Sequence, residues 1–310
     1  MKTALLFAGQ GAQVVGMGKD LAAASLAAQQ VFERANTALG CDLARICFDG
    51  PEADLTKTDN AQPAIFATSI ACLEALRAEL GAQGKTLEFA ATAGLSLGEF
   101  TAHVAAGTMS FEDGMRLVRL RGRAMQAACE ATAGAMAAVL NLDAAVCAEV
   151  CQESGAEVAN LNCPGQIVIS GDKAAVAAAC EKAKARGAKR ALPLNVAGAY
   201  HSRLMAGAQA PLASALAGAT LTAPKVTVVS NVTAQPAVTP DQIRDLLVRQ
   251  VVSPVYWEAS MRWLLAQGFQ RFIELGPGTV LAGFMKRIDA SVPVLSVNDC
   301  ASLAAVAAKL

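Results

Sequence analysis

A G-x-S-x-G pentapeptide occurs once in the chain, as Gly94, Ser96 and Gly98. A short apolar run, 89–93, precedes it, and helix-forming residues follow it over 99–106. Strand, sharp turn and helix in this order are the context in which the pentapeptide forms a nucleophile elbow. The glycines remove the Cβ atoms that would clash when a serine is held in a strained turn. Ser96 would then stand at a helix N-terminus, whose free N–H groups favour developing negative charge.

A serine hydroxyl is a weak nucleophile at neutral pH unless a base takes its proton, and the chain offers two histidines. His103 lies on the same expected helix as Ser96, roughly 10 Å along the axis, which is too far for a hydrogen bond. We therefore expect His103 to be a packed or surface side chain. His201 lies in a Gly-containing turn, 196–201, and could face Ser96; a solvated loop histidine is the alternative. No Asp or Glu follows His201 closely, so its orienting partner could be a backbone carbonyl.

A third candidate is an arginine on the apolar side of the helix expected over 110–129. Ser110 as N-cap and Asp113 at N3 form a capping-box variant at its start. At 100° per residue, Arg121 falls within the apolar face of this helix. That face is made by Leu117, Leu120, Ala124, Met125 and Ala128. Arg121 either snorkels or pairs with a buried acid, or it is a fixed cation that awaits an anion such as a substrate carboxylate.

Composition excludes several classes of protein. Lys and Arg (26) balance Asp and Glu (26), which argues against nucleic-acid binding. The chain contains no run of about 18 apolar residues, so no membrane-spanning helix is predicted. The first apolar run is too short for a signal peptide. Nine cysteines without regular spacing fit reduced thiols in a cytoplasmic protein. No metal or cofactor is expected. The chain has no C-x-x-C motif and only two histidines, which argues against zinc, and Val14 replaces the third glycine of a dinucleotide fingerprint.

Strands and helices are expected to alternate through most of the chain. The expected strands are 3–7, 89–93, 226–230, 271–275 and 292–297. The expected helices are 21–39, 64–80, 99–106, 110–129, 241–250, 254–267 and 301–310, with a loop over 51–58. This alternation predicts an α/β fold with a mainly parallel sheet covered on both faces.

The expected order of strands and helices changes between residues 131 and 194. Strands are expected at 136–140, 158–160, 167–170 and 190–194, and helices at 143–153 and 173–186. The order β-α-β-β-α-β is ferredoxin-like. We therefore expect a large α/β catalytic subdomain, 1–130 and 195–310, with a small ferredoxin-like subdomain, 131–194, inserted into it.

Several motifs occur in a fixed order along the chain. They are Phe7-Ala8-Gly9-Gln10-Gly11, Gln62-Pro63-Ala64, Gly94-Leu95-Ser96-Leu97-Gly98-Glu99, Arg121-Gly122, Asn162-x-Pro164-Gly165-Gln166, Tyr200-His201, Gln250 and Glu274-Leu275-Gly276-Pro277-Gly278. Together they resemble the malonyl-CoA:acyl carrier protein transacylase family of fatty-acid synthesis over essentially the whole chain. The resemblance implies an α/β-hydrolase-like large subdomain and a ferredoxin-like small one, in agreement with the periodicity.

The resemblance also implies roles for single residues. Ser96 would be the nucleophile and His201 its general base, oriented by the backbone carbonyl of Gln250. The backbone N–H groups of Gln10 and Leu97 would form the oxyanion hole. Further residues implied to bind substrate are Arg121, for the malonyl carboxylate, with Gln250, Gln62, Asn162 and Tyr200, the last favouring malonyl over methyl-branched units.

The partners implied by the resemblance are malonyl-CoA and holo acyl carrier protein. Because carrier proteins of this pathway are acidic in the family, a basic docking patch is expected on the small subdomain. Its candidates are Lys182, Lys184, Arg186, Lys189 and Arg190, with a solvated helix face as the alternative.

One departure from the family pattern stands next to the nucleophile. Leu95 occupies the position of the usual histidine, whereas Ala8 in place of proline is a minor change. Leu95 is the only support for one alternative, a catalytically silent binding or docking subunit. Two others stay open independently of it: a thioesterase or serine hydrolase with the same Ser–His pair, and a discrete polyketide-synthase acyltransferase.

Overall fold

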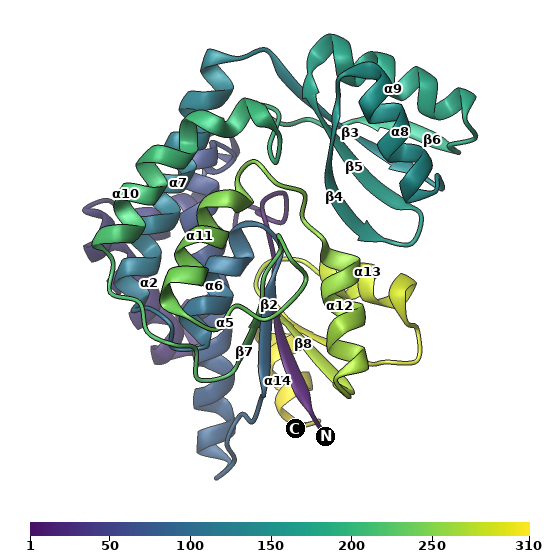
Figure 1. Ribbon diagram of the computed structural model, residues 1–310. Coiled ribbons are helices and arrows are strands. Elements are labelled where there is room, and N and C mark those ends of the chain that lie inside the picture. Colours follow the sequence, from purple (N-terminus) through teal and green to yellow (C-terminus); the bar gives the residue numbers. More distant parts are fainter.

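Five short apolar strands form a parallel sheet at the centre of the larger unit of the protein (Figure 1). The computed structural model describes residues 1–310. The strand order is β7-β2-β1-β8-β9. The bounds are β1 Thr3–Phe7, β2 Ala91–Gly94, β7 Thr227–Val229, β8 Arg271–Leu275 and β9 Val294–Val297. Every residue of β1 is buried, as expected for a central strand covered on both faces.

Alternate residues of β1 enter two different cores. Leu5 and Phe7 belong to the larger core, whereas Ala4 and Leu6 belong to a smaller one. The larger core takes residues from α1 Lys19–Ala24, α2 Leu26–Leu39, α3 Leu43–Asp49, α4 Glu52–Leu55, α5 Thr58–Ala82, α6 Leu97–Ala105, α7 Phe111–Ala131, α10 Gln209–Gly218, α11 Pro240–Gln250 and α14 Cys300–Ala307. Helices of the smaller core are α12 Trp257–Ala266 and α13 Val280–Ile288. This period of two is the pattern of a strand in the middle layer of three.

A four-stranded antiparallel sheet forms the second unit, in the order β4-β5-β3-β6. Its elements are β3 Gly134–Leu140, α8 Ala144–Ser154, β4 Glu157–Cys163, β5 Gln166–Asp172, α9 Lys173–Ala185 and β6 Arg190–Pro193. Ala137 and Val139 of β3 pack under α8 and α9, whereas Met136 and Ala138 face a cavity between the two units. The predicted α/β class and ferredoxin-like arrangement are confirmed; the domain boundaries near 130 and 194 stay a proposal.

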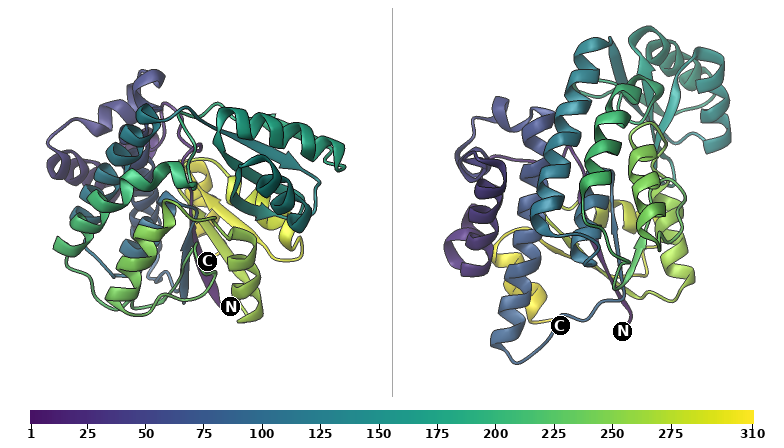
Figure 2. Two further views of the ribbon diagram at one scale, coloured as in Figure 1. Left: turned by 45° about the horizontal axis from the view of Figure 1, so that its top comes forward. Right: turned by 60° about the vertical axis from the view of Figure 1, so that its left-hand side comes forward.

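The second unit stands beyond the carboxyl ends of the parallel strands, opposite both chain termini (Figures 1 and 2). Val255, just before α12, exchanges backbone hydrogen bonds with β4: its N–H donates to Ala159 and its carbonyl accepts from Leu161, at 2.8 and 2.9 Å. Arg287 of α13 donates to the carbonyl of Pro164 at 2.7 Å. These contacts fix the small sheet over the edge at which open α/β sheets bind ligands.

Several helix boundaries differ from the predicted ones. The segment 21–39 is two helices, because Ser25 leaves helical geometry and its Oγ caps α2. The region 51–58 contains a short helix, α4 Glu52–Leu55. Helix α12 starts at Trp257, three residues after Pro254. The prediction also missed α3, α10, α13 and a 3₁₀ helix, Arg203–Ala208.

Helix α5 begins six residues before its predicted start, with Pro63 inside it. Proline has no N–H, so the carbonyl four residues earlier, that of Asp59, loses its helical partner. Arg119 Nη1 donates to this carbonyl at 2.7 Å and replaces the missing bond. A long-range contact thus makes an otherwise unfavourable proline acceptable.

Candidate active site

Ser96 lies in a strained turn between β2 and α6. Its φ of 53° and ψ of −106° are unusual for a residue with a side chain. A Cβ on Gly94 would overlap the carbonyl group of Gly98, and a Cβ on Gly98 would overlap the carbonyl oxygen of Phe7. Both glycines of the pentapeptide are therefore needed for the turn to pack against β1, as the nucleophile-elbow prediction requires.

Asn231 holds this turn from the neighbouring strand end. Its Oδ1 accepts a hydrogen bond from the Ser96 N–H at 2.6 Å, and its Nδ2 donates to the carbonyl of Gly94 at 2.8 Å. Asn231 follows β7, which pairs with β2 in parallel. The side chain therefore fixes the backbone on both sides of Leu95 and offsets part of the strain.

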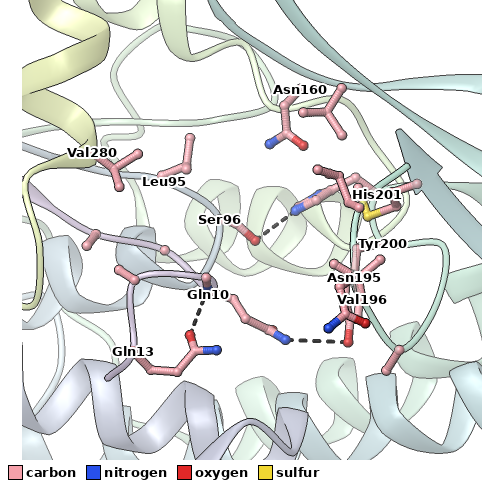
Figure 3. Close-up of a pocket in the computed structure, with 18 of the residues that line it drawn as sticks. Gln10, Gln13, Leu95, Ser96, Asn160, Asn195, Val196, Tyr200, His201 and Val280 are labelled. Atoms are coloured by element: carbon pink, nitrogen blue, oxygen red, sulfur yellow. Dashed lines mark hydrogen bonds between the residues drawn. The ribbon is translucent and has the colours of Figure 1, made fainter. Parts of the chain in front are cut away.

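Ser96 and His201 face each other across the site (Figure 3). Ser96 Oγ lies 2.7 Å from His201 Nε2. His201 Nδ1 lies 2.9 Å from the carbonyl oxygen of Gln250 and 3.2 Å from that of Ser253. Since carbonyls only accept, Nδ1 carries the proton and Nε2 is free to accept from Ser96.

His201 is almost fully buried, and its pKa is lowered from 6.5 to about 4. Desolvation is the main cause, and the positive charge of Arg121 adds to it. The imidazole is therefore neutral at pH 7, which is the protonation state of a general base.

Arg121 is 1% exposed and has no ion-pair partner. Its Nη2 donates to Ser96 Oγ at 3.0 Å and to Gln250 Oε1 at 2.9 Å, and its Nη1 donates to Gln62 Oε1 at 2.8 Å. Its Nε is buried without a partner, and desolvation lowers its pKa to about 10. A buried cation bound only by neutral oxygens, with a free donor, is suited to an incoming anion.

A buried polar chain lies behind Arg121. Gln250 Nε2 donates to Glu99 Oε2 at 2.5 Å and to the carbonyl of Ser96 at 2.9 Å. Glu99 also accepts from the N–H of Asn231 at 3.2 Å. Gln250 therefore contacts three groups of the site. Its backbone carbonyl binds His201, and its side-chain amide binds both Arg121 and the Ser96 turn.

Tyr200 lies beside the loop that follows β1. Its hydroxyl is 2.6 Å from Thr58 Oγ1 and 3.4 Å from Gln10 Nε2 (Figure 3). Desolvation raises its pKa to about 12, so the hydroxyl stays protonated at neutral pH. Tyr200 thereby fixes the side chain of Gln10, whose backbone N–H is a predicted oxyanion donor.

A cavity of about 950 Å³ opens above Ser96 and is lined by both units. Met136, Ala138 and Val168 of the small sheet face it from one side, and Val280, Leu281 and Phe284 of α13 contribute to its wall. Asn162 also lines it, and its Oδ1 is buried without a partner. The lining is part apolar and part polar, so the site can hold an extended ligand with both kinds of group that ends near Ser96.

Residues 4–306 match the family model of the acyl transferase domain. The chain belongs to this family. It is 44% identical over 303 residues to the malonyl CoA-acyl carrier protein transacylase of Bacillus subtilis, which covers 96% of this chain and 94% of that protein. The acyl-carrier-protein S-malonyltransferase of Burkholderia pseudomallei has a TM-score of 0.94 at 42% identity over the full length of both chains. A malonyl-transacylase solved in complex with its type II PKS acyl-carrier protein has a TM-score of 0.94 at 39% identity, again over both full lengths.

The acyl transferase fold brings most of the predicted residues to one place. Ser96, His201, Arg121, Tyr200 and Asn162 line the cavity, as does Gln10. Gln62 and Gln250 are fully buried and do not line it; both hold the guanidinium of Arg121 instead. Their predicted contact with substrate stays a prediction; the structure shows their contact with the arginine.

Leu95, the departure from the family pattern, lies at the cavity beside Ser96 (Figure 3). Its backbone N–H donates to the carbonyl of Phe7 at 3.0 Å, and its side chain packs against the smaller core. The Ser96–His201 contact forms with leucine at this position. His103 is buried, with Nδ1 3.3 Å from Thr108 Oγ1, which is the packed one of the two expected positions, packed or surface.

The candidate docking residues differ in their partners. Lys182, Lys184 and Arg186 form ion pairs with Glu153, Glu181 and Glu149 respectively. Lys189 and Arg190 are exposed and make no ion pair. They are therefore the two candidates with uncompensated charge.

Sequence reasoning missed Asn231, Ser253 and the role of Glu99. All three act through contacts with residues more than 50 positions away. The only local signal was the place of Asn231 at the end of a strand of the parallel sheet, where functional side chains gather. No group of three or more His, Cys, Asp or Glu side chains is placed to hold a metal ion. No helix is long and apolar enough to cross a membrane.

Proposed function

We propose that this protein transfers the malonyl group of malonyl-CoA to the phosphopantetheine thiol of acyl carrier protein, in fatty-acid synthesis, through a malonyl-serine intermediate. The observation that carries the proposal is the position of one oxygen: Ser96 Oγ is 2.7 Å from a neutral imidazole and 3.0 Å from a buried guanidinium. A nucleophile paired with its base and placed beside a fixed cation is suited to an acyl group that bears a carboxylate.

In the first step His201 Nε2 takes the Ser96 proton as Oγ attacks the thioester carbonyl. Electrons move onto the carbonyl oxygen and form a tetrahedral oxyanion. The oxyanion collapses, the carbon–sulfur bond breaks, and the leaving thiolate takes the proton from His201. The products are free coenzyme A and malonyl-Ser96.

The oxyanion is assigned to the backbone N–H groups of Gln10 and Leu97. Leu97 is the first residue of α6, so its N–H has no partner within the helix. The positive end of the helix dipole adds to the stabilisation. Loss of one such donor typically costs about 3–4 kcal/mol in the transition state.

In the second step the thiol of the carrier protein enters the same cavity. His201 takes its proton, the sulfur attacks the serine ester, and Ser96 Oγ leaves with the proton returned from His201. Arg121 holds the malonyl carboxylate through both steps with paired hydrogen bonds. Asn162 and Tyr200 are assigned to contacts with the rest of the substrate.

The carrier protein is proposed to dock on Lys189 and Arg190, the two candidates with uncompensated charge. An acidic partner gains from these charges because no carboxylate of this protein already neutralises them. The nine cysteines are all free thiols, which supports a cytoplasmic location, where thiols stay reduced.

Two other activities would transfer the malonyl group to a different acceptor and can be told apart by their products. A thioesterase with the same Ser–His pair would pass the malonyl group to water, and a polyketide-synthase acyltransferase would pass it to another carrier protein. Mass spectrometry of the intact protein after mixing with malonyl-CoA should show a malonyl adduct on Ser96. The adduct should persist without thiol and disappear when holo carrier protein is added; rapid release as free malonate would identify a hydrolase.

The same measurement tests the silent-subunit alternative, which rests on Leu95. That alternative predicts no adduct at Ser96 at all. Competition between a fatty-acid and a polyketide carrier protein for the malonylated enzyme then separates the two transfer pathways.

A further inference from the structure

Glu99 is a buried carboxylate three residues after the nucleophile, and the proposed reaction gives it no task. It is 1% exposed and has no cation within ion-pair distance. Burial raises its pKa to about 7. Two donors face its Oε2, Gln250 Nε2 at 2.5 Å and the N–H of Asn231 at 3.2 Å. Burying a carboxyl group costs free energy unless hydrogen bonds compensate for its lost hydration. We therefore asked what the two hydrogen bonds of Glu99 do in the site.

Glu99, together with the carbonyl of Ser96, sets which way the side-chain amide of Gln250 points. The amide has one oxygen, which accepts, and one nitrogen, which donates. With the nitrogen toward Glu99 and the Ser96 carbonyl, the oxygen faces Arg121 Nη2 at 2.9 Å. Turned over, the amide would present its N–H₂ to the guanidinium and its oxygen to two other oxygens. The acceptor on Glu99 thus favours the one orientation that binds the arginine.

Arg121 depends on that orientation. Only three acceptors hold its guanidinium, the side-chain oxygens of Gln62, Gln250 and Ser96. Ser96 becomes acylated in the reaction, which leaves the two glutamines as its fixed supports. A rotated Gln250 would remove one of these and present a donor to the cation instead.

We propose that Glu99 is a positioning residue for malonyl selectivity, which acts through the side-chain amide of Gln250 to hold Arg121 where the substrate carboxylate binds. This inference rests on the proposed function. It separates two contacts of Glu99: the bond to Gln250 supports carboxylate binding, and the bond to Asn231 supports the nucleophile turn. Loss of the bond to Gln250 should slow transfer only of an acyl group that has a carboxylate. Loss of the bond to Asn231 should slow transfer of every acyl group.

The test compares acylation of Ser96 by malonyl-CoA and by acetyl-CoA in matched variants. Glu99→Leu replaces the acceptor with a somewhat larger, branched apolar side chain. The ratio of malonyl to acetyl kcat/KM should fall by about 10- to 100-fold, the worth of a hydrogen bond to a charged group. Glu99→Gln keeps an acceptor oxygen and should stay within about threefold of the wild-type ratio, a margin below one hydrogen bond. Asn231→Ala is the matched control: it weakens the turn and should lower both rates while the ratio stays unchanged.

A double variant tests the route through Gln250. Gln250→Leu removes the amide but keeps the backbone carbonyl that orients His201. In that background Glu99→Leu should lower the ratio no further, since residues that act in one chain are not additive. If Glu99→Leu is not folded by circular dichroism, Glu99→Asp, which withdraws the carboxylate by one methylene, replaces it with the same expected direction.

An unchanged ratio in folded Glu99→Leu, or in the Glu99→Asp variant that replaces it, would overturn the positioning role, and so would a second full loss on top of Gln250→Leu. A wild-type protein that forms no malonyl-Ser96 would instead overturn the proposed function. The two failures are therefore distinguishable in one set of measurements.

Discussion

Arg121 Nη2 lies 3.0 Å from Ser96 Oγ, so the cation proposed to select the substrate contacts the atom proposed to attack it. The two residues come from separate helices, α7 and the N-terminus of α6. This contact places a carboxylate-binding group within one short acyl unit of the nucleophile. A substrate whose carboxylate binds Arg121 would therefore have its thioester carbonyl close to Ser96 Oγ.

Arg121→Ala should reduce malonyl transfer far more than acetyl transfer. The malonyl carboxylate would lose its paired charge-assisted bonds, and the loss of malonyl kcat/KM should be on the order of 100-fold or more. Acetyl has no carboxylate, so its transfer should change much less. Steady-state kinetics with both thioesters measure this, and equal losses for the two would remove the assigned role of Arg121.

Ser96→Ala and His201→Ala should each lower transfer by roughly 10⁴-fold or more, as removal of either member of a nucleophile–base pair does. The double variant should be little worse than either single one, because the pair acts as a unit. No malonyl adduct should form on Ser96→Ala. An adduct at full yield on that variant would place the nucleophile elsewhere.

Gly98→Ala should destabilise the fold, because the new Cβ meets the carbonyl oxygen of Phe7 in the central strand. Backbone cannot move aside as a side chain would, so the loss should reach about 1–3 kcal/mol or more. The matched control is Gly81→Ala near the end of α5, where nothing lies within 4 Å. That change should be neutral or slightly stabilising. Urea unfolding of the two variants gives the comparison, and equal stabilities would contradict the packing of the elbow.

Charge reversal at Lys189 and Arg190 should raise the KM for carrier protein and leave transfer to free pantetheine unchanged, because the small thiol needs no docking surface. Lys184→Glu serves as control, since Lys184 already pairs with Glu181. Raised salt should weaken the interaction in the wild-type protein and not in the double reversal. If the charge reversal leaves the KM for carrier protein unchanged, Lys189 and Arg190 are not the docking surface.

How far the sequence could predict this site depends on the range of each contact. The elbow at Ser96 follows from five adjacent residues, and the position of Arg121 follows from helical period alone. The bonds of Asn231 and Gln250 to the turn join residues more than 130 positions apart, and no spacing rule reveals them. Pro63 shows the same limit in the fold: the sequence predicts that the helix starts after this proline, but it starts at Thr58, because Arg119 supplies the missing donor from another helix. Local patterns therefore predict a candidate nucleophile and a buried cation, and the family resemblance supplies their roles. The contacts of Asn231 and Glu99 appear only in the folded chain.

The acid limb of the pH profile should report the burial of His201. Its pKa is lowered from 6.5 to about 4, so the neutral base persists well below the pH at which an exposed histidine is protonated. Acylation by acetyl-CoA should therefore stay near its plateau down to about pH 5 and fall near pH 4. Acetyl-CoA is the suitable substrate because the malonyl carboxyl group would itself titrate. Linkage gives the sign for this residue: below pH 6.5 the unfolded chain binds a proton at His201 that the folded chain does not, so the contribution of His201 to the free energy of unfolding should decrease between pH 6.5 and 4.

Arg121 contributes to this lowered pKa through charge repulsion, after desolvation. In Arg121→Ala the acid limb should therefore move toward higher pH while it stays below 6.5, because burial of the imidazole remains. The rate of acetylation of Ser96 measured from pH 3.5 to 8 in both proteins gives the two limbs, with circular dichroism at each pH to exclude unfolding. A limb near 6.5 in the wild-type protein would show that His201 is solvated and would contradict the buried Ser96–His201 pair.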